Sequence, residues 1–171
     1  PHPLGADSQP EFTSSLNGLS TAPGGGFIVT GGVGVKGVRG NRAWVFKIDE
    51  KGHILWQSRF GGVGNYLALS PHPRPDGGLI VLGIRHLNGF LPFDGGGMAW
   101  VFRLDDHGKM LWERRFMGVK GGLVSALAIL HDGTIAVAGP VLNMKPDQSK
   151  IFVMRVNIHP PLPFVPERKK E

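Results

Sequence analysis

Histidine and cysteine are the side chains that most often bind transition metals in proteins. The chain has seven histidines and no cysteine. Histidines that share a metal commonly lie close together in the chain, as in H-x-x-x-H. No two of the seven have such a spacing; they are His2, His53, His72, His86, His107, His131 and His159. The sequence therefore predicts no bound metal. The lack of cysteine also excludes disulfides, thiolate metal sites and cysteine nucleophiles.

Two aspartate-rich segments, DEKG at 49–52 and DDHG at 105–108, carry oxygen ligands of the kind that calcium prefers. A calcium loop needs such ligands at alternate positions and a closing bidentate glutamate, and neither segment has them. Both are therefore interpreted as hairpin turns. The chain also has no G-x-S-x-G elbow, no P-loop and no G-x-G-x-x-G motif followed by a helix. We predict no catalytic residues and no cofactor; whether the protein is an enzyme stays uncertain, with a non-catalytic role favoured.

Basic residues gather in three segments, 32–42, 85–98 and 140–150, which are expected to be loops on one face of the fold. With Asp94 and Asp147 as their only acidic residues, these segments carry most of the net charge of +6. Variable loops on a rigid scaffold often hold binding sites. The candidate ligand-binding residues are Lys36, Arg39, Arg42, Arg85, His86, Phe90, Phe93, Lys145 and Lys150. The alternative is that the loops are simply polar and the phenylalanines fold back onto the scaffold.

The scaffold is indicated by an internal repeat. The stretch AWVFKIDEKGHILWQSRF at 43–60 returns as AWVFRLDDHGKMLWERRF at 99–116, and a partial copy, IFVMRVN, follows at 151–157. A second element recurs with it, as PGGGFIVTG, PDGGLIVLG and HDGTIAVAG. Two elements that recur together every 52 to 56 residues indicate a repeat architecture.

Each repeat is expected to form four antiparallel strands, at about 66–71, 79–84, 98–105 and 109–116 in the second copy. The 27 glycines and 14 prolines favour short strands joined by tight turns over helices. The AWVF segment is apolar at every position, which suits a strand covered on both faces. The predicted fold class is therefore all-β, with about three four-stranded blades of a β-propeller, the last incomplete.

The pattern V/F-K/R-I/L-D-x-x-G-x-x-L-W, followed by R-F-G-G and then D-G-G-x-I-V-x-G, resembles the tandem propeller repeats of bacterial exported proteins. It is more distantly similar to pyrroloquinoline-quinone-type propeller blades. The resemblance covers roughly residues 13–157 and implies a periplasmic or secreted location. This chain departs from it where such repeats often have an acidic residue before the third strand, since Asn41-Arg42 and Gly97-Met98 stand there.

We expect a flexible segment at 1–12, blades at about 13–60, 61–116 and 117–157, and a proline-rich basic tail at 158–171. The start at Pro1 is typical of a processed chain or of a piece of a longer protein. Three blades form an open arc, because propellers typically close with four to eight. A homodimer could complete a six-bladed ring, or the rest of a longer chain could do so. No apolar run is long enough to span a membrane.

Two sets of repeated side chains are given structural roles. Trp44, Trp56, Trp100 and Trp112 are expected to fill the core between blades. The basic residues that recur near the end of the third strand are expected to pair with acidic turn residues such as Asp76 or Asp132; they are Lys47, Arg103 and Arg155.

Three functions remain open. The favoured one is a non-catalytic binding or scaffold module that recognises an anionic protein, surface or polysaccharide through the basic loops. The second is a fragment of a quinone-cofactor propeller oxidoreductase, which would need calcium ligands and a catalytic aspartate that the chain does not show. The third is binding of single-stranded nucleic acid, with bases stacked on Phe90 and Phe93.

Overall fold

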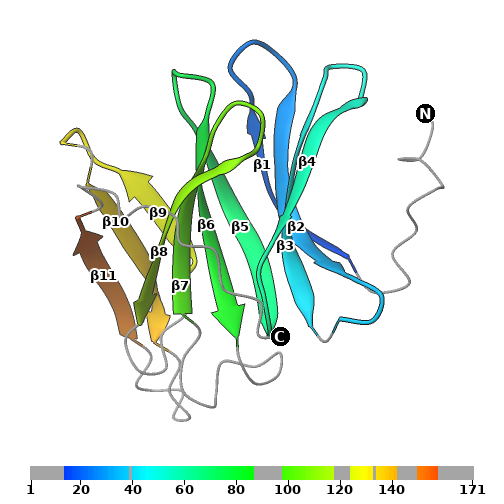
Figure 1. Ribbon diagram of the computed structural model, residues 1–171. Helices are drawn as coiled ribbons and strands as arrows, with labels where there is room; N and C mark the ends of the chain where they lie inside the picture. The colour runs from blue at the N-terminus through cyan, green and yellow to red at the C-terminus, as the bar shows by residue number, and fades with distance from the viewer. Residues whose placement is uncertain are drawn as a thin grey trace.

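The computed structural model describes residues 14–38, 40–86, 98–117, 124–132, 134–141 and 150–157. Its described residues form three antiparallel β-sheets and no helix (Figure 1). The first sheet contains β1 (Ser15–Thr21), β2 (Phe27–Gly34), β3 (Asn41–Ile48) and β4 (Ile54–Phe60). The second contains β5 (Asn65–Pro73), β6 (Leu79–His86), β7 (Met98–Leu104) and β8 (Met110–Met117). The third contains β9 (Ala126–Ile129), β10 (Ile135–Val141) and β11 (Lys150–Val156).

In each sheet the strands lie in chain order, so neighbouring strands are antiparallel and consecutive in the chain. The all-β prediction is confirmed, and the strands expected in the second copy are found as β5 to β8 with ends that differ by one or two residues. The third sheet has three strands among the described residues, which agrees with an incomplete last repeat. The segments 1–12 and 158–171 lie outside the described residues.

The aspartate segments form hairpin turns, as predicted. Asp49 Oδ1 accepts hydrogen bonds from the backbone N–H groups of Lys51 and His53, both at 2.8 Å. Asp105 caps the second turn in the same way. Gly52 and Gly108 close the two turns with φ of +88° and +78°, a conformation that glycine adopts without steric cost.

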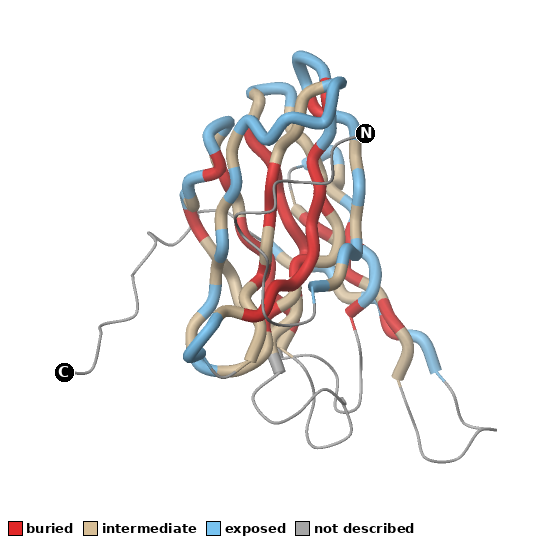
Figure 2. The backbone as a smooth tube through the Cα atoms, turned by 90° about the vertical axis from the view of Figure 1, so that its right-hand side faces the viewer, coloured by how far each residue is buried: buried red, intermediate tan, exposed pale blue. Residues whose placement is uncertain are grey.

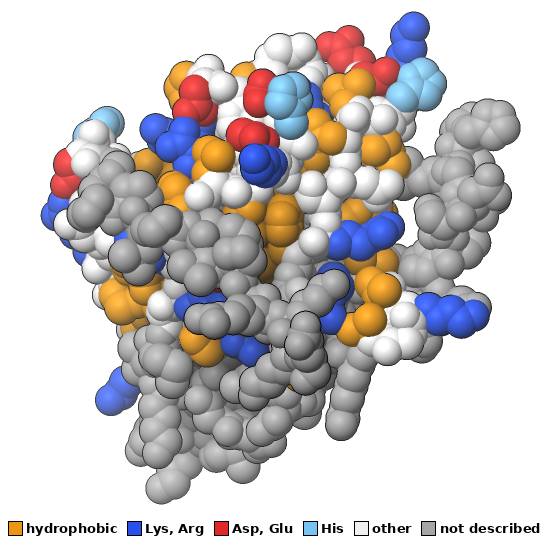
Figure 3. Space-filling model, viewed as in Figure 1, with side chains coloured by type: hydrophobic (Ala, Val, Ile, Leu, Met, Phe, Trp, Pro, Cys, Tyr) orange, Lys and Arg blue, Asp and Glu red, His pale blue; other side chains and the backbone are white. Residues whose placement is uncertain are grey.

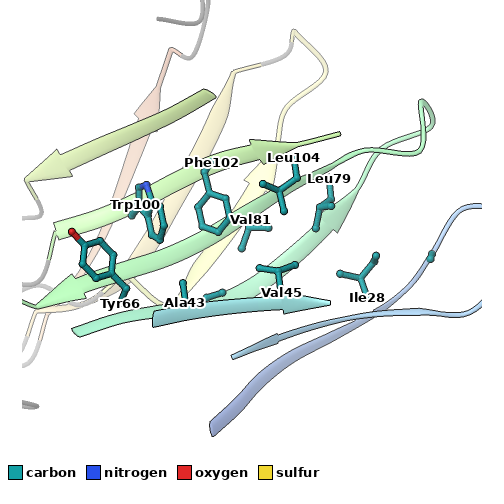
Figure 4. Close-up of a cluster of buried hydrophobic side chains, with 11 residues drawn as sticks. Ile28, Ala43, Val45, Tyr66, Leu79, Val81, Trp100, Phe102 and Leu104 are labelled. Atoms are coloured by element: carbon teal, nitrogen blue, oxygen red, sulfur yellow. The ribbon is translucent and has the colours of Figure 1, made fainter. Parts of the chain in front are cut away.

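The first and second sheets pack face to face through one apolar cluster. Successive residues of a strand point to opposite faces, so Ala43 and Val45 of β3 face the second sheet, where Trp100 and Phe102 of β7 meet them (Figure 4). Tyr66 is fully buried beside Trp100, with the ring centroids 5.4 Å apart. This cluster fixes the position of β5 against the first sheet.

The opposite face of the second sheet packs on the third sheet. Ala99 and Val101 of β7 lie in this second cluster together with Ile135, Val137 and Phe152. Both faces of β7 are therefore covered, as the apolar AWVF pattern predicts, and Figure 2 shows long runs of buried residues along the strands. The three sheets consequently stand side by side in chain order, in a blade-like arrangement (Figure 1).

The tryptophans have the predicted packing role, but to different degrees. Trp100 and Trp112 are 1% and 7% exposed, and Trp56 packs against the first cluster. Trp44 is half-buried and stacks on Phe46, on the face of the first sheet that points away from the second.

Candidate binding surface

Four of the candidate lysines and arginines lie at one end of the three sheets, which we call the basic end. It consists of Lys36, Arg42, Arg85 and Lys150. The strand register places three of them: Arg42 is opposite Val33, Arg85 is opposite Met98, and Lys150 is opposite Val141. Each of these pairs lies where the second and third strands of a sheet are joined, and Lys36 lies two residues after the end of β2. The sequence expectation that these residues share one face of the fold is thus supported for the described four.

The opposite end, which we call the turn end, carries the hairpin turns 22–26, 49–53, 74–78, 105–109 and 130–134 together with the strand positions beside them. Six of the seven described carboxylates lie there: Asp49, Glu50, Asp76, Asp105, Asp106 and Asp132. Six basic side chains accompany them: Lys47, Lys51, Arg74, Arg103, Lys109 and Arg155. In Figure 3 the acidic side chains and histidines gather over these turns, at the top of the view. The turn end is therefore close to neutral.

The seventh described carboxylate, Glu113, belongs to neither end. It lies in β8, where its Oε2 accepts a 2.6 Å hydrogen bond from the Trp100 indole N–H and its Oε1 accepts a 2.9 Å bond from Arg115. No described carboxylate lies at the basic end. The charges of Arg42, Arg85 and Lys150 consequently have no acidic residue beside them in the described part of the chain.

Arg85 is held in place by the link between the first two sheets. Its guanidinium carbon lies 5.2 Å from the centre of the Tyr66 ring, within the range of a cation–π contact. One of its nitrogens donates a 3.3 Å hydrogen bond to the Val63 carbonyl. Because Tyr66 is locked in the core, this arginine presents its charge from a fixed position.

Asn65 ties the two neighbouring sheets together at the same end. Its side-chain oxygen accepts a 3.0 Å hydrogen bond from the backbone N–H of Asn41, the residue before Arg42. Gly40 approaches so closely that a Cβ there would lie 2.4 Å from the Gly64 carbonyl oxygen. Arg42 and Arg85 thus flank a tightly packed junction, which is a rigid base for two charges.

Of the remaining candidate residues, the structure describes only the backbone of His86. Arg39, Phe90, Phe93 and Lys145 lie outside the described residues, as do Asp94 and Asp147. His86 ends β6 at the basic end. Their part in binding therefore stays a prediction from the sequence.

The ion pairs predicted between strand cations and turn aspartates are confirmed for two of three repeats. Arg103 binds Asp76, and Arg155 binds Asp132. Lys47 has no such partner, because Gly24 occupies the corresponding turn position of the first repeat. The difference between PGGG and PDGG in the sequence is the signal that could have revealed it.

Among the described residues, three titratable groups have shifted pKa values. Hydrogen bonds from His53 lower the pKa of Asp49, and hydrogen bonds from Thr134, with a smaller contribution from Arg155, lower that of Asp132. Burial lowers the pKa of His72, whose Nε2 lies 3.1 Å from Ser70 Oγ. These three residues belong to hairpin turns and to β5, so none of the shifts concerns the basic end.

The described residues contain no group of three or more histidine, aspartate or glutamate side chains arranged to hold a metal ion. Nor do they include a helix long and apolar enough to cross a membrane. Comparisons of the chain with protein-family models and with curated proteins find no match.

Proposed function

We propose that this protein is a non-catalytic binding or scaffold module built from β-propeller blades, and that its basic end recognises an anionic protein, surface or polysaccharide. The observation that carries the proposal is the separation of charge. The described carboxylates lie at the turn end or in β8, and no described carboxylate lies beside Arg42, Arg85 or Lys150.

The physical basis is the field of several like charges on one surface. Isolated surface charges separated by more than about 8 Å are largely screened at physiological salt, so only a group of like charges attracts a polyanion over useful distances. The turn end cannot do this, because its six carboxylates offset its six cations. Binding at the basic end is therefore expected to weaken steeply as salt is added.

Retention on a heparin column tests the proposal with a matched pair of triple variants. Arg42→Glu, Arg85→Glu and Lys150→Glu together reverse charge at the basic end. Lys51→Glu, Arg74→Glu and Lys109→Glu make the same change of net charge at the turn end. We expect the first triple variant to elute at a much lower salt concentration than the second. Equal elution of the two would show that net charge alone governs retention, and would contradict the proposal.

The propeller assignment is supported by the two outer faces of the arc. Ile151 and Val153 of β11 are 83% and 76% exposed, although the equivalent Ala99 and Val101 of β7 are completely buried against the third sheet. The outer face of the first sheet exposes Phe27 at 37%, where the equivalent Leu79 is 1% exposed. Each outer face thus has the chemistry of an interface between sheets.

We propose that a second copy of the chain covers these faces. The outer face of the third sheet is equivalent, position by position, to the face of the first sheet that the second sheet covers. It is likewise equivalent to the face of the second sheet that the third sheet covers. A second copy whose first sheet packs there would repeat the packing already present. Two such contacts would join two arcs of three blades into a six-bladed ring, within the usual range for propellers.

A further inference from the structure

The first hairpin of each sheet closes with the same backbone hydrogen bond, so equivalent positions can be compared, although Gly24 and Gly26 have φ of +81° and +75° where Asp76 and Gly78 have no positive φ. A backbone N–H donates to the carbonyl four residues later in all three: Ala22 to Gly26, Arg74 to Gly78, and Leu130 to Thr134. This register makes Gly24 the equivalent of Asp76 and Asp132. It also aligns the strand cations, because Lys47, Arg103 and Arg155 lie opposite the second residues of β2, β6 and β10.

In the second and third sheets a carboxylate joins the turn to the strand cation. Asp76 accepts a 3.1 Å hydrogen bond from the Gly78 N–H through Oδ1 and binds Arg103 through Oδ2. Asp132 accepts a 3.0 Å bond from the Thr134 N–H through Oδ1 and binds Arg155 through Oδ2. The same two kinds of donor, a turn N–H and a cation, thus hold a carboxylate twice.

The first sheet has Lys47 and Gly26 at the positions of the two donors and lacks the carboxylate. Gly24 has no side chain; a Cβ built there would meet no atom within 4 Å, but the φ of +81° is one that L residues rarely adopt. No described residue forms an ion pair or a hydrogen bond with the side chain of Lys47. The equivalent turn N–H belongs to Gly26, and no described side chain accepts a hydrogen bond from it.

A cavity of about 360 Å³ occupies this place. Its walls are the glycines 24–26, Lys47, the β3–β4 turn and Leu55. Asp49 is already bound to His53, with Oδ2 2.9 Å from Nδ1, and its pKa is lowered accordingly. Glu50 lies beside Gly25, where a Cβ would be 3.5 Å from Glu50 Oε1. Pockets of roughly 300 Å³ and above accommodate small ligands.

We propose that this cavity binds a carboxylate that also carries an N–H donor, supplied by a free amino acid or by an acidic residue of a peptide. The ligand carboxylate takes the place of the missing aspartate, between Lys47 and the Gly26 N–H. Its N–H group faces Glu50, whose charge would repel a ligand that had only acidic groups. This cavity is at the turn end, so the inference is independent of the function proposed for the basic end.

Titration of the ¹⁵N-labelled protein with two probes, followed by NMR amide shifts, tests the inference and separates the sources. The probes are free L-aspartate and the capped peptide acetyl-Gly-Asp-Gly-amide. We expect shifts at Gly24, Gly25 and Gly26, with a dissociation constant on the order of 1 mM for a ligand that makes a few contacts at an open site. Shifts with free aspartate indicate a small-molecule ligand, and shifts with the peptide alone indicate a protein partner.

Variants make the test specific. Lys47→Ala should weaken binding at least about tenfold, the usual result of losing a charged hydrogen bond. Gly24→Asp should abolish it, because the new carboxylate occupies the site from within. Asp76→Gly should create a second site at Arg103. Lys109→Ala is the control and should bind as the wild type. It removes an exposed lysine from the β7–β8 turn, which is the equivalent in the second sheet of the β3–β4 turn that lines the cavity.

The inference is overturned if neither probe shifts the amides of the turn at saturating concentration. It is also overturned if Lys47→Ala binds as tightly as the wild type. A folded Gly24→Asp protein that still binds would exclude the position assigned to the ligand carboxylate.

Discussion

Gly108→Ala and Gly52→Ala form a matched pair that measures how tightly the turn between β7 and β8, which we call the second hairpin, packs on the first sheet. Both glycines close the turn between the third and fourth strands, and both have a left-handed backbone, with φ of +78° and +88°. Their surroundings differ. A Cβ at Gly108 would lie 2.5 Å from Trp56 Cε3, whereas a Cβ at Gly52 would meet nothing within 4 Å.

The expected losses of stability follow from these two terms. An alanine in the left-handed region costs about 1–2 kcal/mol, and both variants incur that cost. At Gly108 the added methyl group must also displace Trp56, and forcing extra volume into a packed site costs typically about 1–3 kcal/mol more. Gly52→Ala should therefore lose about 1–2 kcal/mol and Gly108→Ala about 2–5 kcal/mol.

Urea unfolding followed by tryptophan fluorescence gives the free energy of unfolding for each variant. Trp56→Leu, combined with Gly108→Ala in a double-mutant cycle, should remove most of the excess loss, because the smaller side chain leaves room for the methyl group. Equal losses for Gly108→Ala and Gly52→Ala would refute the packing of the second hairpin against β4.

Three further predictions address the core, the pH dependence and the ring. Trp100→Ala should cost about 3–5 kcal/mol in urea unfolding, whereas the equivalent Trp44→Ala should cost clearly less because Trp44 is only half-buried; the reverse order would contradict the assigned faces. Burial lowers the pKa of His72 from its ordinary 6.5, so the unfolded chain binds the proton more readily and stability should be complete above pH 6.5 and fall below it. His72→Gln should fall less steeply over that range, and an unchanged slope would rule out this residue as the cause. Light scattering should give twice the 18.4 kDa mass of one chain, and Ile151→Asp with Val153→Asp should give the single-chain mass; a wild-type protein that is already a single chain would contradict the proposed ring.

The sequence predicts the strands and turns well because their signals are local. The D-x-x-G segments specify hairpins through Asp49 and Asp105, whose side chains bind backbone groups two and four residues later. The AWVF segments specify covered strands through apolar residues on both faces. Neither signal depends on distant parts of the chain.

What the sequence could not predict depends on which sheets are neighbours. Trp44 and Trp100 have identical local sequences, yet one is half-buried and the other is fully covered, because only the second sheet has a described sheet on each side. The stacking of Arg85 on Tyr66 depends instead on the strand register within the second sheet, where the two residues lie opposite each other on β6 and β5. The cavity beside Lys47 was visible in the sequence only as a glycine in place of an aspartate, and its meaning required the register of the turn.

The location of polyanion binding tests the proposed function most directly. Hydrogen–deuterium exchange of the wild-type protein, measured with and without heparin, maps the bound surface along the backbone. We predict slower exchange in the presence of heparin around Lys36, Arg42, Arg85 and Lys150, with no change in the hairpin turns. Slower exchange at the turns 49–53 and 105–109, with none at the basic end, would contradict the account.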